Sequence, residues 1–221
     1  MGARPSFDTE LELLNIDLIK MAGLAEEAIK NAVVALSKRD KDMAKSVVDN
    51  DREVDAMEKE IEARCLKLLL RQQPVARDLR QISTALKMIT DIERIGDQAA
   101  DIAEILLMLD DDEEPAKIAR HIPQMAEVAS AMVNDSVTAF TNTDLEAAKR
   151  VIATDDVVDD LFNKVKSDLI ESITTTPSKI DEAIDVMMIA KYLERIGDHA
   201  VNICEWVEFY ETGEHKNTKI I

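Results

Sequence analysis

The feature that most constrains this chain is an internal duplication. At an offset of 104 residues the second half superposes on the first, so that Asp40 meets Asp144, Asp51 meets Asp155 and Asp55 meets Asp159. After a shorter turn the offset becomes 101, which places Ile-Glu-Arg-Ile-Gly-Asp at 92–97 over Leu-Glu-Arg-Ile-Gly-Asp at 193–198. A repeat of this length predicts that the fold is built from two similar units.

Each unit is predicted to contain three long helices. Apolar residues recur at helical spacing over about 7–36, and a second helix, capped by Asp40, carries an apolar stripe from Ala44 to Leu68. Pro74 marks a reversal into a third helix that ends near 109. In the second half we expect a fourth helix at about 117–140. A fifth helix should begin at a capping box of Thr143 and Glu146 and end at Pro177, and a sixth should begin at a cap by Ser178 and end near 210.

The fold class that follows is all-α, with two tandem three-helix bundles of six long antiparallel helices. Five glycines and five prolines in 221 residues leave few interruptions, which favours helices over sheet. We expect the first bundle at 1–110, an acidic linker at 111–116, the second bundle at 117–212 and a polar tail at 213–221.

Composition narrows the classes of function. A formal charge of -18 and an aromatic content of 3% disfavour nucleic acid as the main partner. Both cysteines, Cys65 and Cys204, fall within helical patterns, as expected of a reduced, cytosolic protein. No apolar stretch has the length of a membrane span, and the N-terminus does not read as a leader, so we expect a soluble protein that reaches a membrane only through partners.

Acidic residues form a ladder on the third helix of each unit. Residues four apart lie on one face of a helix. The first ladder is Glu93, Asp97 and Asp101, extended by Glu104, and the second is Glu194, Asp198, Asn202 and Glu205. The second helices add Asp51 and Asp55 in one unit, and Asp155 and Asp159 in the other. If the second and third helices pack antiparallel, these rows face one another across a groove.

Such a groove is chemically suited to a cation. Like charges at this spacing repel, and a bound ion removes that cost. Oxygen donors without His or Cys select Mg²⁺, Ca²⁺, Mn²⁺ or oxidised iron and disfavour a structural zinc site. The Glu-x-x-His pair of di-iron bundles does not occur, and His199 should point away from the ladder. The alternative is that the ladders are solvated faces; duplication favours metal binding or partner binding.

Three further features are open to more than one interpretation. Gly96 and Gly197 lie inside predicted helices, either for close helix packing or to leave room beside the carboxylates for an ion or a partner. Arg94 and Arg195 are each expected to pair with the Asp three residues later. The turn segment 71–80 gathers three arginines that could hold an anion or an acidic partner, although pairing with Asp and Glu of neighbouring helices is favoured.

Three segments resemble the PhoU family of phosphate-signalling regulators. They are Arg-Gln-Gln-Pro-Val-Ala-Arg-Asp-Leu-Arg at 71–80, Asp-Ile-Glu-Arg-Ile-Gly-Asp at 91–97 and Leu-Glu-Arg-Ile-Gly-Asp-His-Ala at 193–200. The resemblance spans nearly the whole chain. It implies paired three-helix bundles with multinuclear metal clusters on the ladders. It also implies a negative regulator that links the ATPase of a phosphate ABC transporter to a sensor histidine kinase, commonly as a homodimer.

The resemblance also implies a set of ligands and occupants. The family's ligand positions carry over to Glu93, Asp97, Asp101, Glu194 and Asp198, with iron as the first candidate and manganese, magnesium, calcium or zinc as others. Asn202 replaces an acid with an uncharged amide, so we expect the second site to bind cations more weakly or to hold fewer. A non-enzymatic adaptor is the main hypothesis. A metal-dependent enzyme and a purely structural helical scaffold are the alternatives.

Overall fold

Six long helices account for nearly all of the described chain. The computed structural model describes residues 5–72, 74–109, 120–215 and 218–219. Its helices are α1 (Pro5–Lys38), α2 (Lys41–Gln72), α3 (Ala76–Met108), α5 (Ile122–Asn142), α6 (Leu145–Thr175) and α7 (Ile180–Thr212), with a short 3₁₀ turn, η1 (Pro177–Lys179). The predicted all-α fold of two three-helix units is confirmed.

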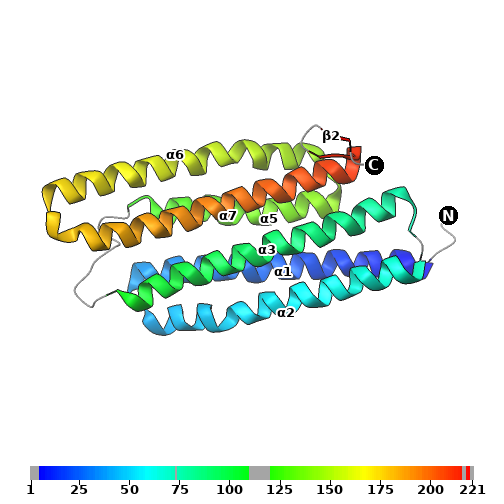
Figure 1. The fold of residues 1–221 in the computed structure, drawn as a ribbon, viewed down its shortest axis with the longest axis horizontal. Coiled ribbons are helices and arrows are strands. Elements are labelled where there is room, and N and C mark those ends of the chain that lie inside the picture. Colours follow the sequence, from blue (N-terminus) through cyan, green and yellow to red (C-terminus); the bar gives the residue numbers. More distant parts are fainter. Residues whose placement is uncertain (1–4, 73, 110–119, 216–217, 220–221) are drawn as a thin grey trace.

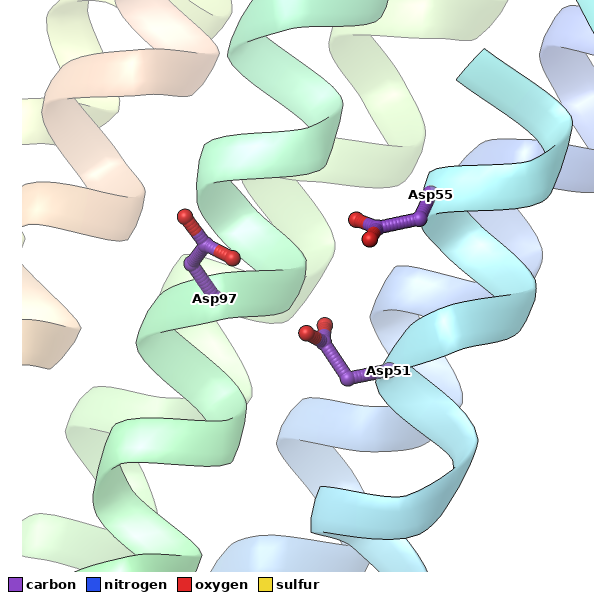
Figure 2. A group of neighbouring side chains, drawn as sticks. All are labelled: Asp51, Asp55 and Asp97. Carbon is purple, nitrogen blue, oxygen red and sulfur yellow. The ribbon is translucent and has the colours of Figure 1, made fainter. Parts of the chain in front are cut away.

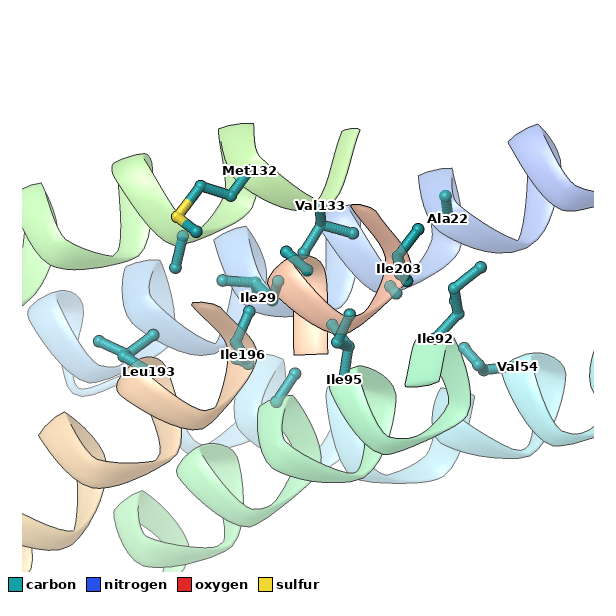
Figure 3. Close-up of a cluster of buried hydrophobic side chains, with 14 of the residues drawn as sticks. Ala22, Ile29, Val54, Ile92, Ile95, Met132, Val133, Leu193, Ile196 and Ile203 are labelled. Carbon is teal, nitrogen blue, oxygen red and sulfur yellow. The ribbon is translucent and has the colours of Figure 1, made fainter. Parts of the chain in front are cut away.

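The two units lie side by side along their length (Figure 1). Helices α1, α2 and α3 pack on one another, as do α5, α6 and α7, and the units meet where α3 packs on α7 and α1 on α5. The helices that meet have more buried side chains than α2 and α6. As a result, buried side chains of both halves form one continuous cluster, which includes Ile92 and Ile95 of α3 and Ile196 and Ile203 of α7 (Figure 3).

The helix ends repeat between the halves. Asp40 caps α2 by accepting a hydrogen bond from the backbone N of Met43 at 2.9 Å, as predicted. In the second half, Asp144 accepts from the backbone N of Ala147 at 2.9 Å. The residues before the two caps, Arg39 and Thr143, both adopt the left-handed conformation, with φ of 57° and 55°.

Two predicted caps were therefore wrong. Thr143 does not form a capping box with Glu146, because it ends α5 in the left-handed conformation and leaves the N-cap to Asp144. Ser178 does not cap the last helix, because it lies within the turn η1 that precedes Ile180. The fourth helix begins at Ile122, later than expected, after a turn at Arg120 and His121. The predicted acidic linker at 111–116 lies outside the described residues.

The polar tail folds back on the bundle. Strand β1 (Glu214–His215) pairs antiparallel with β2 (Thr218–Lys219), and the ring of His215 stacks on Trp206 with the centroids 3.9 Å apart. None of the described helices has an apolar stretch long enough to span a membrane.

Candidate metal centre

Three carboxylates converge between α2 and α3. Asp51 and Asp55, one turn apart on α2, project toward α3, where Asp97 lies (Figure 2). One oxygen of each lies within 4.8 Å of the others, and all three side chains are half-buried. The apolar positions of α2, including Val54, bury against the core and leave this acidic row along the edge of the helix interface. We call this the first groove.

Glycine lets the two helices approach at this point. A Cβ on Gly96 would lie 3.1 Å from Asp51 Oδ1 and 3.3 Å from Val54 Cγ1. In the second half, a Cβ on Gly197 would lie 3.0 Å from Asp155 Oδ1. In both halves, then, the space beside the glycine is filled by a carboxylate of the neighbouring helix. The structure therefore shows close helix approach, the first of the two interpretations of these glycines, while room for an ion or a partner stays a prediction.

Burial and mutual repulsion disfavour full ionisation of the first groove. Burial, followed by the negative charges of Asp97, Asp55, Asp101 and Glu104 in that order, raises the pKa of Asp51 to about 6. The pKa values of Glu93 and Asp101 are also raised, again chiefly by burial. A cation bound among these oxygens would relieve both costs.

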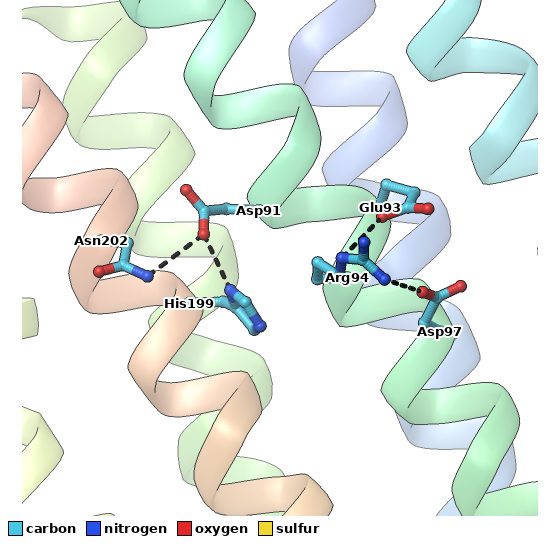
Figure 4. A network of polar contacts seen from close by, with 6 residues as sticks. All are labelled: Asp91, Glu93, Arg94, Asp97, His199 and Asn202. Atoms are coloured by element: carbon cyan, nitrogen blue, oxygen red, sulfur yellow. Dashed lines mark hydrogen bonds and ion pairs between the residues drawn. The ribbon is translucent and has the colours of Figure 1, made fainter.

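The remaining first-ladder residues have additional partners. Arg94 approaches Glu93 with its Nε at 3.5 Å and Asp97 with its Nη1 at 3.1 Å (Figure 4). The predicted pairing of Arg94 with Asp97 is confirmed. Asp101 also accepts a hydrogen bond from the hydroxyl of Tyr192 on α7, and the charge of Arg195 acts on it. Asp101 thus lies between the first groove and the α3–α7 interface.

The second groove, between α6 and α7, repeats the core of this arrangement. Burial, followed by the negative charges of Asp198, Asp159 and Glu194, raises the pKa of Asp155 to about 6. These four acids are therefore close enough to repel one another. Within the described ranges, however, only Asp51, Asp55 and Asp97 bring three carboxylate oxygens within 4.8 Å of one another.

Two residues of the second ladder are engaged elsewhere. Glu194 binds the ammonium of Lys191, with Nζ 2.6 Å from Oε1. Asn202 donates its amide Nδ2 to Asp91 Oδ1 of α3 at 3.3 Å (Figure 4). His199 Nδ1 also lies 2.8 Å from Asp91 Oδ1, which confirms that His199 points away from the ladder. The amide nitrogen of Asn202 therefore forms a hydrogen bond between the two halves.

Sequence reasoning missed two residues beside the grooves, Glu58 in the first and Lys191 in the second. Glu58 follows Asp55 on the same face of α2, and burial, Glu62 and Asp55 raise its pKa. Its repeat equivalent at the offset of 104 is Phe162. The equivalent of Lys191 at the offset of 101 is Thr90. Alignment of the two halves could have revealed both substitutions. A search for acids that the halves share does not find them, because it compares only identical residues.

The arginine-rich turn joins the two halves. Arg77 Nη2 lies 3.1 Å from Glu211 Oε1, and Arg80 Nε donates to the backbone O of Tyr210 at 2.9 Å. The favoured interpretation, pairing with a neighbouring helix, is confirmed for Arg77. The side chain of Arg71 lies outside the described part of the chain.

The donor set fits a hard cation. The acids of both grooves offer oxygen only, the ligand type that Mg²⁺, Ca²⁺, Mn²⁺ and oxidised iron prefer. Gly96 and Gly197 provide the cradle, since a methyl group at either position would press on a carboxylate of the opposite helix.

Comparison with known proteins matches nearly the whole chain. The family model described as "PhoU domain" matches twice, over residues 18–106 and 122–207. The phosphate-specific transport system accessory protein PhoU homolog of Clostridium acetobutylicum is 37% identical over 212 residues, covering 96% of each chain. The crystal structure of PhoU from Pseudomonas aeruginosa has a TM-score of 0.88 at 32% identity and covers 95% of this chain and 100% of its own. The phosphate transport system regulatory protein PhoU from Streptococcus pneumoniae has a TM-score of 0.87 at 28% identity, over 95% of this chain and 99% of its own.

Proposed function

This chain belongs to the PhoU family, and from that premise we propose that it is an accessory regulator of phosphate transport. It represses phosphate uptake and phosphate-starvation signalling as a metal-binding adaptor between a phosphate-specific ABC transporter and a sensor histidine kinase. Its partners are the transporter ATPase and the kinase, and it works as a homodimer in the cytoplasm, at the inner face of the membrane. The two bundles, 1–110 and 117–212, are the units through which it acts.

The observation that carries the metal-binding part is the convergence of Asp51, Asp55 and Asp97. The proposed ligands are Asp51, Asp55, Glu93, Asp97 and Asp101 in the first groove and Asp155, Asp159, Glu194, Asp198 and Asn202 in the second. Bound ions supply positive charge that neutralises the grooves and ties α2 to α3 and α6 to α7. Iron is the first candidate occupant, followed by manganese, magnesium, calcium and zinc.

Elemental analysis of protein purified without chelators tests metal binding. The unmodified protein is expected to carry stoichiometric metal, and a variant with Glu93, Asp97, Glu194 and Asp198 changed to their amides is expected to lose it. Metal at background in the unmodified protein would overturn the proposal and leave the grooves as docking faces.

The regulatory part has separate tests. The transporter ATPase and the kinase are expected to co-purify with the tagged protein, and deletion of its gene is expected to derepress phosphate-starvation genes. Retention of neither partner, with unchanged expression on deletion, would remove the adaptor role. A size-exclusion profile of the monomer alone would remove the homodimer.

A non-enzymatic role is supported by the name of the Clostridium relative, which is an accessory protein of a transport system. A metal-dependent enzyme would also need an open coordination position and a general base beside the ions. Turnover of a substrate that Asp97→Ala abolishes would favour that alternative.

A further inference from the structure

The second groove contains a positive charge of its own. Lys191 lies on α7 one turn before Glu194, and its Nζ is 2.6 Å from Glu194 Oε1 and 2.5 Å from Oε2. Both oxygens of this acid thus contact one ammonium. The side chain of Glu194 is 18% exposed and that of Lys191 42% exposed, so the pair lies at the rim of the groove with the carboxylate inward.

The surroundings hold the ammonium at this place. Lys191 Nζ lies 5.8 Å from the ring centroid of Phe162 on α6, within the range of a cation–π interaction. Its charge also acts on Asp198, lowering a pKa that burial and Glu194 raise. Lys191 therefore interacts with both walls of the groove, contacts Glu194 directly and acts on Asp198 through its charge.

The first groove has different residues at the equivalent positions. Thr90, which is exposed, replaces Lys191, and the acid Glu58 replaces Phe162. Both grooves contain the arginine of the Glu-Arg-Ile-Gly-Asp motif, but Arg94 lies 3.5 Å from Glu93 and 3.1 Å from Asp97, whereas the charge of Arg195 acts on Asp101. The first groove thus has the acids Glu58 and Asp101 where the second has Phe162 and Asn202. Its glutamate Glu93 faces an arginine Nε at 3.5 Å, whereas Glu194 faces an ammonium at 2.6 Å.

We propose that Lys191 is a resident counter-ion of the second groove, whose ammonium takes the place beside Glu194 that a metal ion takes beside Glu93 in the first. The inference rests on the proposed metal-binding function. A lysine ammonium is a compact charge with three donors, so it can neutralise a carboxylate pair without any ion. A metal that enters the second groove has to displace it from Glu194. The first groove is then the tighter site for divalent cations.

Equilibrium dialysis of the full chain with Mn²⁺ tests this. In a background with Asp51→Asn and Asp97→Asn, residual binding reports on the second groove. There, Lys191→Thr, which installs the residue of the first groove, is expected to tighten Mn²⁺ binding about tenfold. Lys191→Arg keeps the charge and is expected to leave binding weak. Lys149→Thr is the matched control, because Lys149 pairs with Glu146 three residues away, outside the groove.

The reciprocal change tests the same idea from the other side. In a background with Asp155→Asn and Asp198→Asn, Thr90→Lys is expected to weaken Mn²⁺ binding by the first groove about tenfold. Thr90 is exposed, so the substitution leaves the core intact, and a thermal melt checks the fold.

The outcomes separate the two proposals. If the first groove binds Mn²⁺ and Lys191→Thr does not tighten the second, the inference fails and the metal function stands. If Lys149→Thr tightens binding as much as Lys191→Thr, the effect is one of overall charge, and the inference also fails. If neither groove binds Mn²⁺ in any variant, both proposals fail, and Lys191 and Glu194 form an ordinary helix ion pair.

Discussion

In the first groove, Asp51 and Asp55 are followed on the same face of α2 by Glu58, whereas in the second Asp155 and Asp159 are followed on α6 by Phe162. Asp51 and Asp155 behave alike, since both have their pKa values raised to about 6 by burial and then by neighbouring acids. Their neighbours differ, because Asp55 and Asp97 are half-buried whereas Asp159 and Asp198 are exposed. The residues that surround the shared acids differ as well. Duplication has kept most of the carboxylates, has Asn202 in place of Asp101, and has changed the charge of the residues around them.

Removing the shared carboxylates should give the largest effect. Changing Asp51, Asp55 and Asp97 to Asn is expected to weaken the tighter class of Mn²⁺ sites by about a hundredfold, because it removes the converging oxygens. The matched change of Asp155, Asp159 and Asp198 is expected to affect only the weaker class. Equilibrium dialysis distinguishes them, and equal losses would mean that the grooves are equivalent.

The metal-free grooves should respond equally to pH. The pKa values of Asp51 and Asp155 are higher in the folded protein than in the unfolded chain, so stability falls as pH rises from about 4 through 6. Asp51→Asn and Asp155→Asn are each expected to stabilise the metal-free protein at pH 7 by roughly 1 to 2 kcal/mol, allowing for solvent screening. The gain should vanish near pH 4.

Urea unfolding at several pH values in chelator measures this effect. A gain that persists unchanged at pH 4 would assign it to a cause other than charge. Added Mn²⁺ should reverse the gain for Asp51→Asn more than for Asp155→Asn, since the first groove is the tighter site in the proposal.

The helix caps provide a comparison in which the halves should not differ. Asp40→Ala and Asp144→Ala each remove a side-chain acceptor from the first turn of a helix and are expected to cost about 1 kcal/mol. Metal binding should stay unchanged in both. Thermal melts measure the cost, and a difference between the two variants would show that the halves differ in stability away from the grooves.

The glycines should give the smallest effect and separate the halves again. Alanine gains roughly 0.5 to 1 kcal/mol of helix propensity over glycine. At Gly197 its Cβ meets the flexible carboxylate of Asp155 at 3.0 Å, while the nearest Val158 carbon is 3.6 Å away. At Gly96 it also meets Val54 Cγ1 at 3.3 Å. Gly197→Ala is therefore expected to stabilise the metal-free protein slightly, and Gly96→Ala to do so less or not at all.

Thermal melts in chelator give the order of the two glycine variants. A larger gain for Gly96→Ala would contradict the geometry. Both substitutions should weaken Mn²⁺ binding in their own groove, because the added methyl displaces Asp51 or Asp155.

The helices and the shared ladder were predictable from sequence because both depend on periodicity within one segment. Apolar spacing predicted α1, α2, α3 and the later helices to within a few residues, except for the start of α5. The cap at Asp144 was missed because Thr143 and Glu146 fit a known local pattern, although the repeat itself aligns Asp144 with Asp40. The local capping pattern and the repeat thus predicted different N-caps, and the one predicted by the repeat is correct.

The contacts between the halves were not predictable in this way. The hydrogen bond from Asn202 to Asp91 depends on the register of α3 against α7, which no spacing within either helix specifies. The same holds for Asp101 and Tyr192. Glu58 and Lys191 are a different case: the sequence contains them, but only a comparison of unlike residues at equivalent positions brings them out.

Those contacts across α3 and α7 are related to each other by the repeat. Asp101 of one half is equivalent to Asn202 of the other, and Asp91 to Tyr192, so the halves meet as two subunits of a symmetric pair would. In an assembly of identical chains, every mutation appears in both copies of a site. Joining the copies in one polypeptide removes that restriction, because each codon now specifies a single position. A lysine can then arise in one groove while the other keeps a threonine, and one protein can hold two sites of different strength at a fixed one-to-one ratio.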